Sequence, residues 1–420
     1  MSRHFMTGCI VALYTLVGLT QGADAANQFL NVMALPLPNP HPACASAVNA
    51  IPNDGSSDWS AFNCAVNLLP ASGGTIYVPA GAFNLHLTVE VIDRNVAFRG
   101  EGQNVTKLVW NTSGDGIRFM STANGDPTSG VIGAVNYTLA IRSMSLIKYQ
   151  TNGGAAIQGI WVRPTWHGVH GIVTTTITDV HIGSEPWPSA STYWHYGIQL
   201  QNSTTAKISM FNIQGSSSTG GVSAIQIRGD TDGAGKSIGT QIRNGTISKF
   251  VRGIETRDHA EGLHVQEVTI REAGWGIQMT SGQGTSIANS YISARNVGVE
   301  LTNTTNVSIT NNTIDHIEDQ VFTGIDLKGS EFGSNSVRMM GNSVSSPYAP
   351  GTGPSRNGIV LDGGMSHAIV EGNTTMNMEI GVWLKNSNVI FSSVVGNINR
   401  NFTVGDVVDL GAANYVMHNH

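Results

Sequence analysis

The stretch NVGVELTNTTNVSITNNTIDHI, residues 296–317, alternates single apolar residues with polar ones and breaks every few residues at Asn and Thr. Apolar residues at every second position are typical of short β-strands with one buried side, and the Asn and Thr clusters between them indicate turns. Strands this short cannot bury their apolar sides alone. The stretch therefore predicts one unit of a repeating structure.

The repeat is visible as a phrase of Gly or Ala followed by aliphatic–x–aliphatic. The phrase begins at residues 197, 224, 253, 276, 298, 324, 358 and 381, at intervals of 22 to 34 residues. A second phrase, apolar–x–apolar and then Asn, follows and supplies Asn212, Asn244, Asn289, Asn312, Asn342, Asn373 and Asn397. Repeats of this length bury a core by stacking, which predicts a parallel β-solenoid. We expect the asparagines to form an internal ladder of amide hydrogen bonds.

Composition is consistent with a large folded core. The chain has 420 residues, of which 12% are charged, and a net charge of −6. The acidic residues are spread along the chain and no basic run occurs, so neither a nucleic acid nor an anionic membrane is an expected partner. The sequence does not indicate an oligomeric state.

The N-terminus resembles a secretory signal. An apolar stretch from Phe5 to Leu19 follows Arg3, and Ala23-Asp24-Ala25 fits a cleavage site. An anchoring membrane helix is the alternative, but it needs about 20 uninterrupted apolar residues. We therefore expect a secreted or periplasmic protein with no membrane span after processing. The expected segments are a signal peptide at 1–25, an N-terminal segment with a capping helix at 26–75, and a parallel β-helix at 76–420.

Two cysteines, Cys44 and Cys64, remain after removal of the signal segment. An even pair in an exported protein favours one disulfide, with two free buried thiols as the alternative. The sequence contains no CxxC motif and no Cys/His spacing typical of a metal site.

The stretch NDGSSDWSAFNCAVNLLPASGGTIYVPAGAFNLHLTVEVIDRNVAFRGEGQNVTKLVW, residues 53–110, resembles the opening of the pectate-lyase-like superfamily. This resemblance implies an all-β fold, a single-stranded right-handed parallel β-helix. Apolar residues at helical spacing between Asp58 and Leu69 predict a short helix that caps the open N-terminal end. Members of the superfamily include polysaccharide lyases, polygalacturonase-like hydrolases, uronate epimerases and phage tailspikes, so the resemblance implies a long polysaccharide lying along the stack as the substrate.

The middle position x of each Gly-aliphatic phrase is predicted to point outward, because its aliphatic neighbours point into the core. In chain order these positions are Gln199, Gln226, Glu255, Gln278, Glu300, Asp326, Val360 and Trp383. Adjacent coils lie about 4.8 Å apart. Glu255 and Glu300 would then be roughly 9 to 10 Å apart, as in an inverting acid/base pair. Glu300 and Asp326 would be close enough to raise one carboxyl pKa or to bind calcium.

The position before each glycine forms a neighbouring column that contains Tyr196, Arg252 and Trp275. An aromatic ring suits a sugar face, and Arg suits a uronate carboxylate. The candidate catalytic residues are Glu255, Glu300, Asp326, Arg252, Arg271, His316 and Lys249. The candidate substrate-binding residues are Tyr196, Gln226, Trp275, Gln278 and Arg295.

A second segment, IDHIEDQVFTGIDLKGS at 314–330, is similar to the Ile-Asp-His segment of pectate lyases and the calcium strand that follows it. Asp315, His316 and Asp326 match that pattern, whereas the first calcium Asp and the downstream Arg segment are missing. Calcium is therefore a possible cofactor without a complete ligand set.

Four functions remain open. In a lyase, Arg252, Arg271 or a cation would neutralise the uronate carboxylate, and Lys249 or His316 would remove the C5 proton. In a hydrolase, Glu255, Glu300 and Asp326 would divide the acid and base roles. In a non-catalytic glycan-binding or structural protein, Trp187, Trp194, Tyr196 and Trp275 would stack on sugars. A uronate epimerase is a further alternative.

Overall fold

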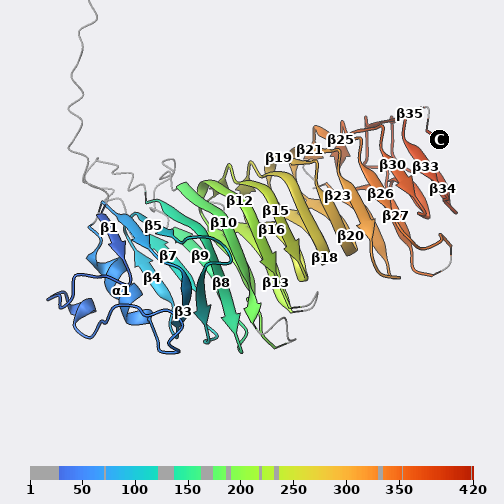
Figure 1. Cartoon of the computed structure of the whole chain (residues 1–420). Coiled ribbons are helices and arrows are strands. Elements are labelled where there is room, and N and C mark those ends of the chain that lie inside the picture. The colour runs from blue at the N-terminus through green and yellow to red at the C-terminus, as the bar shows by residue number, and fades with distance from the viewer. Residues whose placement is uncertain are drawn as a thin grey trace, which may run out of the picture.

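The computed structural model describes residues 28–420 apart from 71, 122–136, 162–173, 186–190, 217–219, 231–235, 330–333, 352 and 418. The predicted signal peptide lies outside the described residues. Within the described part the chain winds as an elongated parallel β-helix, with its only α-helix at the N-terminal end (Figure 1). No helix in these described ranges is long and apolar enough to cross a membrane.

Each coil contributes in turn to three long parallel sheets. The first sheet contains β4 (Val89–Ile92), β7 (Ile117–Ser121), β9 (Ala155–Trp161), β11 (Tyr196–Gln201), β13 (Gly221–Arg228), β16 (Phe250–Arg257), β23 (Phe322–Lys328), β27 (Arg356–Asp362), β31 (Ile380–Leu384) and β34 (Gly405–Asp409). The second contains β1 (Gln28–Asn31), β2 (Gly74–Tyr77), β5 (Val96–Arg99), β14 (Ser237–Ile238), β17 (Ala260–Glu261), β19 (Gln283–Ala288), β21 (Thr305–Thr310), β25 (Val337–Met340), β29 (Ile369–Glu371), β32 (Ser393–Val395) and β35 (Tyr415–Met417). The third contains β3 (Gly81–Leu85), β6 (Thr106–Trp110), β22 (Thr313–His316), β26 (Ser343–Ser345), β30 (Thr374–Met376) and β33 (Ile398–Arg400).

Several longer strands bend around a corner and belong to more than one sheet. Strands β8 (Leu139–Tyr149), β10 (Thr174–Glu185), β12 (Thr204–Gln214) and β15 (Gln241–Ser248) continue from the second sheet into the third, β20 (Tyr291–Thr302) continues from the third into the first, and β18 (His264–Thr280) runs through all three. A separate pair, β24 (Ser334–Asn335) and β28 (Met365–Ser366), lies outside them.

The glycines of the repeated phrase permit close stacking of the coils. A Cβ atom on Gly298 would lie 2.3 Å from Ile314 Cγ2 and 2.5 Å from the carbonyl oxygen of Gly324 in the next coil. The two aliphatic residues of each phrase, such as Val299 and Leu301 on either side of Glu300, are fully buried. Inward aliphatics at every second position therefore form the core, as the alternating pattern predicts.

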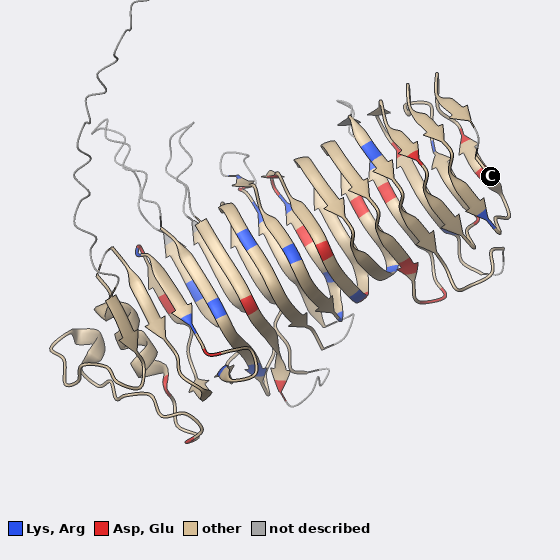
Figure 2. Cartoon of the chain, turned by 45° about the horizontal axis from the view of Figure 1, so that its top comes forward, with Lys and Arg blue, Asp and Glu red and all other residues tan. Residues whose placement is uncertain are grey.

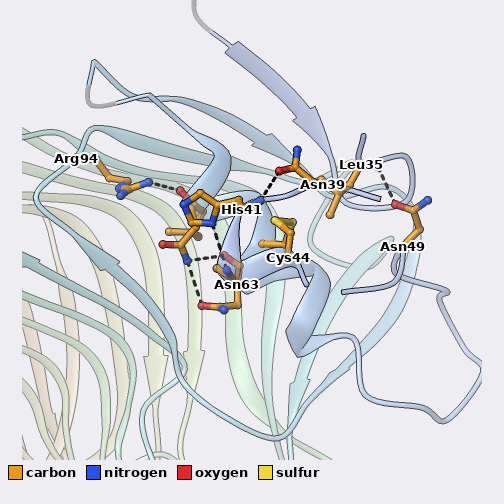
Figure 3. Close-up of a disulfide and its surroundings, with 11 residues drawn as sticks. Leu35, Asn39, His41, Cys44, Asn49, Asn63 and Arg94 are labelled. Atoms are coloured by element: carbon orange, nitrogen blue, oxygen red, sulfur yellow. Dashed lines mark hydrogen bonds between the residues drawn. A yellow bond between two sulfur atoms is a disulfide. The ribbon is translucent and has the colours of Figure 1, made fainter. Parts of the chain in front are cut away.

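The N-terminal end is closed by α1 (Trp59–Leu68), as the sequence predicts. Phe62 and Val66 of this helix are buried, and Arg94 Nη1 donates to the carbonyl oxygens of Val66, at 2.5 Å, and Leu69, at 3.1 Å. Cys64 on α1 forms a disulfide with Cys44 of η1 (Pro42–Cys44), with the Cα atoms 4.8 Å apart (Figure 3). The predicted disulfide is thus confirmed.

The asparagine ladder forms in part. Asn312, Asn342, Asn373 and Asn397 are buried at the corner between the second and third sheets, and each side chain accepts from the backbone N–H of the residue one coil before it. The ladder extends to Asn419, whose Oδ1 accepts from Asn397 N at 3.1 Å.

The other three asparagines of the predicted ladder are not part of it. Asn212, Asn244 and Asn289 are exposed, because each is displaced by one residue from the inward corner position. Asn244 and Asn289 occupy the bend itself, with φ of 51°. The sequence period places an Asn near the corner but does not distinguish the inward position from its neighbours.

Candidate functional site

The predicted outward column exists and is longer than the sequence indicates. Strand pairing places its members in register along the first sheet, from Glu90 through Arg118, Gln158, Gln199, Gln226, Glu255, Gln278, Glu300, Asp326, Val360 and Trp383 to Val408. Figure 2 shows charged residues interspersed along the strands of the β-helix. Residues that are far apart in the chain therefore become neighbours on one surface.

Three consecutive members of the column, Gln158, Gln199 and Gln226, are amides joined by hydrogen bonds. Gln158 Nε2 donates to Gln199 Oε1 at 2.7 Å, and Gln199 Nε2 donates to Gln226 Oε1 at 2.7 Å. Gln226 Nε2 in turn donates to Glu255 Oε2 at 2.7 Å. Gln226 is buried in this row, so its prediction as a substrate-binding residue is wrong.

Glu255 is fully buried, which contradicts its predicted role as an exposed catalytic acid. Its carboxylate accepts from Ser223 Oγ at 2.5 Å, forms an ion pair with Arg257, and lies 3.4 Å from Arg252 Nε. Every oxygen of this carboxylate is thus engaged by the protein. Glu255 holds two arginines on the first sheet and cannot reach a substrate.

Glu300 and Asp326 form the only close pair of carboxylates in this column. Lys328 Nζ lies 2.5 Å from Glu300 Oε1 and 3.0 Å from Asp326 Oδ2 and so bridges the two. Both carboxylates retain some exposure, with side-chain accessibilities of 13% and 14%. The sequence predicts the adjacency of the two carboxylates correctly but misses the lysine between them.

Burial raises the pKa of the Asp326 carboxyl, and the neighbouring charge of Glu300 acts in the same direction, whereas Lys328 lowers it. The net result is an Asp with a pKa above its ordinary value. The two carboxylates raise the pKa of Lys328, so this side chain stays an ammonium ion. A carboxyl whose pKa burial raises, next to a second carboxylate that is paired with a cation, is an arrangement suited to acid/base chemistry.

The position of Lys328 also bears on the prediction that Glu300 and Asp326 bind calcium. The ammonium group of Lys328 occupies the position between Glu300 and Asp326 where a shared cation would lie. Among the described residues no group of three His, Cys, Asp or Glu side chains is arranged to hold a metal ion.

The neighbouring column is also in register. Tyr196, Ser223, Arg252, Trp275 and Val297 follow one another on successive strands. Arg252 lies over the Trp275 ring at 5.7 Å, and its Nε donates to Gln278 Oε1 at 2.5 Å. Gln278 Nε2 then donates to Glu300 Oε2 at 2.7 Å. Hydrogen bonds therefore connect Arg252 to the carboxylate pair, while Tyr196 lies three coils before Trp275.

His316 does not belong to the site. It is buried, stacks on Phe322 with ring centroids 4.4 Å apart, and its Nδ1 faces Ser346 Oγ at 3.1 Å. Burial lowers the pKa of its imidazole to about 4. The imidazole is neutral but enclosed, so the prediction that His316 removes a substrate proton is wrong.

The other predicted cations, Arg271, Lys249 and Arg295, lie outside the column of the first sheet. Arg271 is exposed on the third sheet, where it pairs with Ser248. Lys249 occupies the bend before β16 with φ of 61°. Arg295 forms an ion pair with Glu318 at 2.7 Å. None of these three side chains has a described contact with Glu300 or Asp326.

Two charged residues that pair with carboxylates of the column were missed by the sequence analysis, and each lies two positions after a member of the column. Arg257 is two residues after Glu255, and Lys328 is two residues after Asp326. Residues i and i+2 of a strand share a face, so the same alternation that identified the column could have found both. Trp194, predicted as a possible sugar platform, is instead buried beneath Lys148, whose Nζ lies 4.0 Å from its ring. Trp187 lies outside the described residues.

Comparisons with known proteins agree with the β-helix fold. Residues 158–419 match the family model described as the right handed beta helix region. A comparison with curated protein sequences finds no match.

Solved structures with a similar fold come from several proteins. The A-module of the mannuronan C-5 epimerase AlgE6 of Azotobacter vinelandii is 17% identical, with a TM-score of 0.56, covering 88% of this chain and 96% of that one. The catalytic domain of a GH87 alpha-1,3-glucanase in complex with nigerose is 14% identical, with a TM-score of 0.57, covering 92% and 70%. The Agl-KA catalytic domain is 12% identical, with a TM-score of 0.58, covering 89% and 69%. At these identities the likeness shows the fold, and with the family match it establishes that the chain belongs to the right-handed β-helix family.

Proposed function

We propose that the protein is an exported polysaccharide-degrading enzyme that binds a long glycan along the outer surface of the first sheet. The observation that carries this proposal is the pair of partly exposed carboxylates, Glu300 and Asp326, bridged by Lys328. The epimerase module and the glucanase catalytic domain, which have the same fold, support a glycan as the ligand.

The separation of the two carboxylates favours glycoside hydrolysis with retention. Their nearest oxygens cannot be farther apart than the sum of their distances to Lys328 Nζ, 2.5 Å and 3.0 Å. Retaining glycosidases hold their carboxyl groups about 5 Å apart, whereas inverting ones leave roughly 6.5 to 9.5 Å for a water molecule. The burial of Glu255 argues against the wide Glu255–Glu300 pair expected from the sequence.

The chemistry assigns a role to each group. The carboxylate of Glu300, 2.5 Å from Lys328 Nζ, attacks the anomeric carbon and forms a glycosyl-enzyme ester while the glycosidic bond breaks. Asp326, whose pKa burial raises, gives its proton to the leaving oxygen. Asp326 then takes a proton from water, which attacks the ester and restores both carboxyl groups.

Trp275 and Arg252 favour a uronate-containing glycan. The Trp275 ring, partly exposed one coil before Glu300, offers a face for a sugar. Arg252 lies over that ring and supplies a charge for a uronate carboxylate.

Export is supported by the Cys44–Cys64 disulfide, since disulfides persist mainly in oxidising compartments. The signal segment predicted at residues 1–25 fits the same proposal.

The decisive experiment compares wild type with Glu300→Gln on a panel of neutral and uronate-containing polysaccharides. We expect wild type to release reducing ends without the ultraviolet absorbance of an unsaturated uronate, and Glu300→Gln to lower kcat by roughly 1,000-fold. Glu371→Gln, an exposed carboxyl on the second sheet, is the matched control and should retain full activity.

Each other result contradicts the hydrolase. Unsaturated products would mean a lyase, changed uronate configuration without cleavage would mean an epimerase, and binding without turnover would mean a glycan-binding protein. Full activity in Glu300→Gln would exclude the carboxylate pair as the site.

A further inference from the structure

The second sheet carries a stripe of exposed basic residues on its outer surface. Arg99 on β5, Arg142 on β8, Lys207 on β12 and Arg243 on β15 are all exposed. Register places Arg99 beside Arg142, and Thr178 and Ser209 continue the same column to Arg243. Lys207 lies in the adjacent column of the same surface.

These four cations have no ion-pair partner within the part of the chain that the structure describes. On the first sheet, by contrast, Arg118, Arg257 and Lys328 are each paired with a carboxylate. Arg99 and Arg142 are in-register neighbours on strands about 4.8 Å apart, so their like charges repel. An acidic protein with a net charge of −6 thus keeps an uncompensated basic stripe on one surface.

Three carboxylates near the stripe accept hydrogen bonds from neutral side chains and form no ion pair with its cations within the described residues. The hydroxyl of Tyr77 donates to Glu101. Gln103 Nε2 donates to Asp179 at 3.0 Å, and Gln266 Nε2 donates to Glu267 at 3.0 Å. The four exposed cations of the stripe, which have no ion pair within the described residues, can therefore contact a ligand.

We propose that this basic stripe, together with Tyr77 at one end of its column and Gln266 at the other, binds a strand of acidic polysaccharide. This site is separate from Glu300 and Asp326. Arg99 and Arg142 lie one coil apart, with Lys207 and Arg243 farther along the same surface, and this row of cations matches a ligand with negative charges repeated along an extended chain. Thr178 and Ser209, whose hydroxyls lie 3.1 Å apart, and Gln266 supply hydrogen-bonding groups for sugar hydroxyls.

The aromatic residues distinguish a glycan from a nucleic acid. Single-stranded nucleic acids bind where aromatic side chains stack on successive bases. Here the aromatics are confined to one end, where Phe29 stacks on Tyr77 with ring centroids 5.4 Å apart. No aromatic residue interrupts the described column between Tyr77 and Gln266. A terminal aromatic pair suits one sugar face, and the rest of the stripe suits repeated carboxylate or sulfate groups.

The test measures binding of full-length wild type and the Arg99→Gln/Arg142→Gln variant to polygalacturonate, to its carboxyl-reduced form and to single-stranded DNA. The control variant is Arg338→Gln/Arg400→Gln, which removes two exposed cations outside the stripe, one farther along the second sheet and one on the third sheet. We expect the Arg99/Arg142 variant to bind polygalacturonate roughly tenfold more weakly and with less salt dependence, because two charged contacts are lost. The control should bind like wild type.

Three results would overturn the proposal: unchanged affinity in the Arg99/Arg142 variant, equal affinity of wild type for the carboxyl-reduced polymer, or tighter binding of DNA than of polygalacturonate. Cleavage of a short oligosaccharide is the parallel readout. It depends on Glu300 and should not change in the Arg99/Arg142 variant, so failure of this inference and failure of the proposed enzyme are distinguishable.

Discussion

The corner between the second and third sheets is filled differently in the two halves of the molecule. In the earlier coils the inward corner position is occupied by Met144, Val180, Phe211 and Val268, which are all buried. In the later coils the same position carries the asparagines from Asn312 to Asn419. Ser290 lies between the two, because its Oγ accepts from Val268 N and its N–H donates to Asn312 Oδ1.

The two fillings stabilise the corner by different means. The apolar corner depends on volume: Gly245 leaves room for Phe211, whose ring would lie 2.1 Å from a Cβ at that position. The amide corner depends on directional bonds that connect each coil to the next. Asn312 lies in the chain between Glu300 and Asp326. The ladder therefore fixes the register of the coils that carry the proposed catalytic pair, where a small displacement would separate the two carboxylates.

The largest effect is expected for Asn342→Ala. This change removes the acceptor of Asn312 N and Asn312 Nδ2 and the donor to Ile309 O, and leaves these groups buried without partners. We expect a loss of about 4 kcal/mol in the free energy of unfolding, measured by urea denaturation.

The matched change at the apolar corner is Val180→Ala, which removes two methyl groups and no hydrogen bond. We expect it to cost about 2 kcal/mol. Equal losses in the two variants would show that the ladder adds nothing beyond packing.

A smaller effect is expected for Glu255→Gln, which tests whether the buried carboxylate has a structural or a catalytic role. The change removes the negative charge between Arg252 and Arg257, whose partly exposed side chains can be solvated instead. We expect a loss of about 2 kcal/mol in unfolding free energy and less than a tenfold change in kcat. A loss of activity comparable to that of Glu300→Gln, with stability unchanged, would restore Glu255 to the catalytic site.

The smallest effect is expected for Ser290→Asn, which extends the ladder into the earlier half by one coil. An amide there has Val268 N as a donor and Asn312 Oδ1 as an acceptor. We expect the free energy of unfolding to stay within about 1 kcal/mol of wild type. A loss above about 3 kcal/mol would show that space, rather than bonding partners, sets the end of the ladder.

The sequence by itself determined the β-helix, the N-terminal helix and the neighbours along the first sheet. Alternation has a period of two and each coil repeats one phrase, so aligning Gly253, Gly276, Gly298 and Gly324 suffices to place Glu255, Gln278, Glu300 and Asp326 in one column. These features depend on the alternation of apolar residues and on the stacking of repeated units, and the sequence contains the signals for both.

Only the tertiary structure decided which side chains of that column are exposed to solvent and which ion pairs form. Glu255 and Glu300 occupy equivalent positions in the repeated phrase, yet one is fully buried and the other remains partly accessible. The difference comes from long side chains nearby: Arg252 and Arg257, on the same strand as Glu255, enclose its carboxylate, whereas Lys328 reaches from the next coil to Glu300 and pairs with Asp326 on its own strand. Rotamers and burial depend on all neighbours at once, which no period in the sequence encodes.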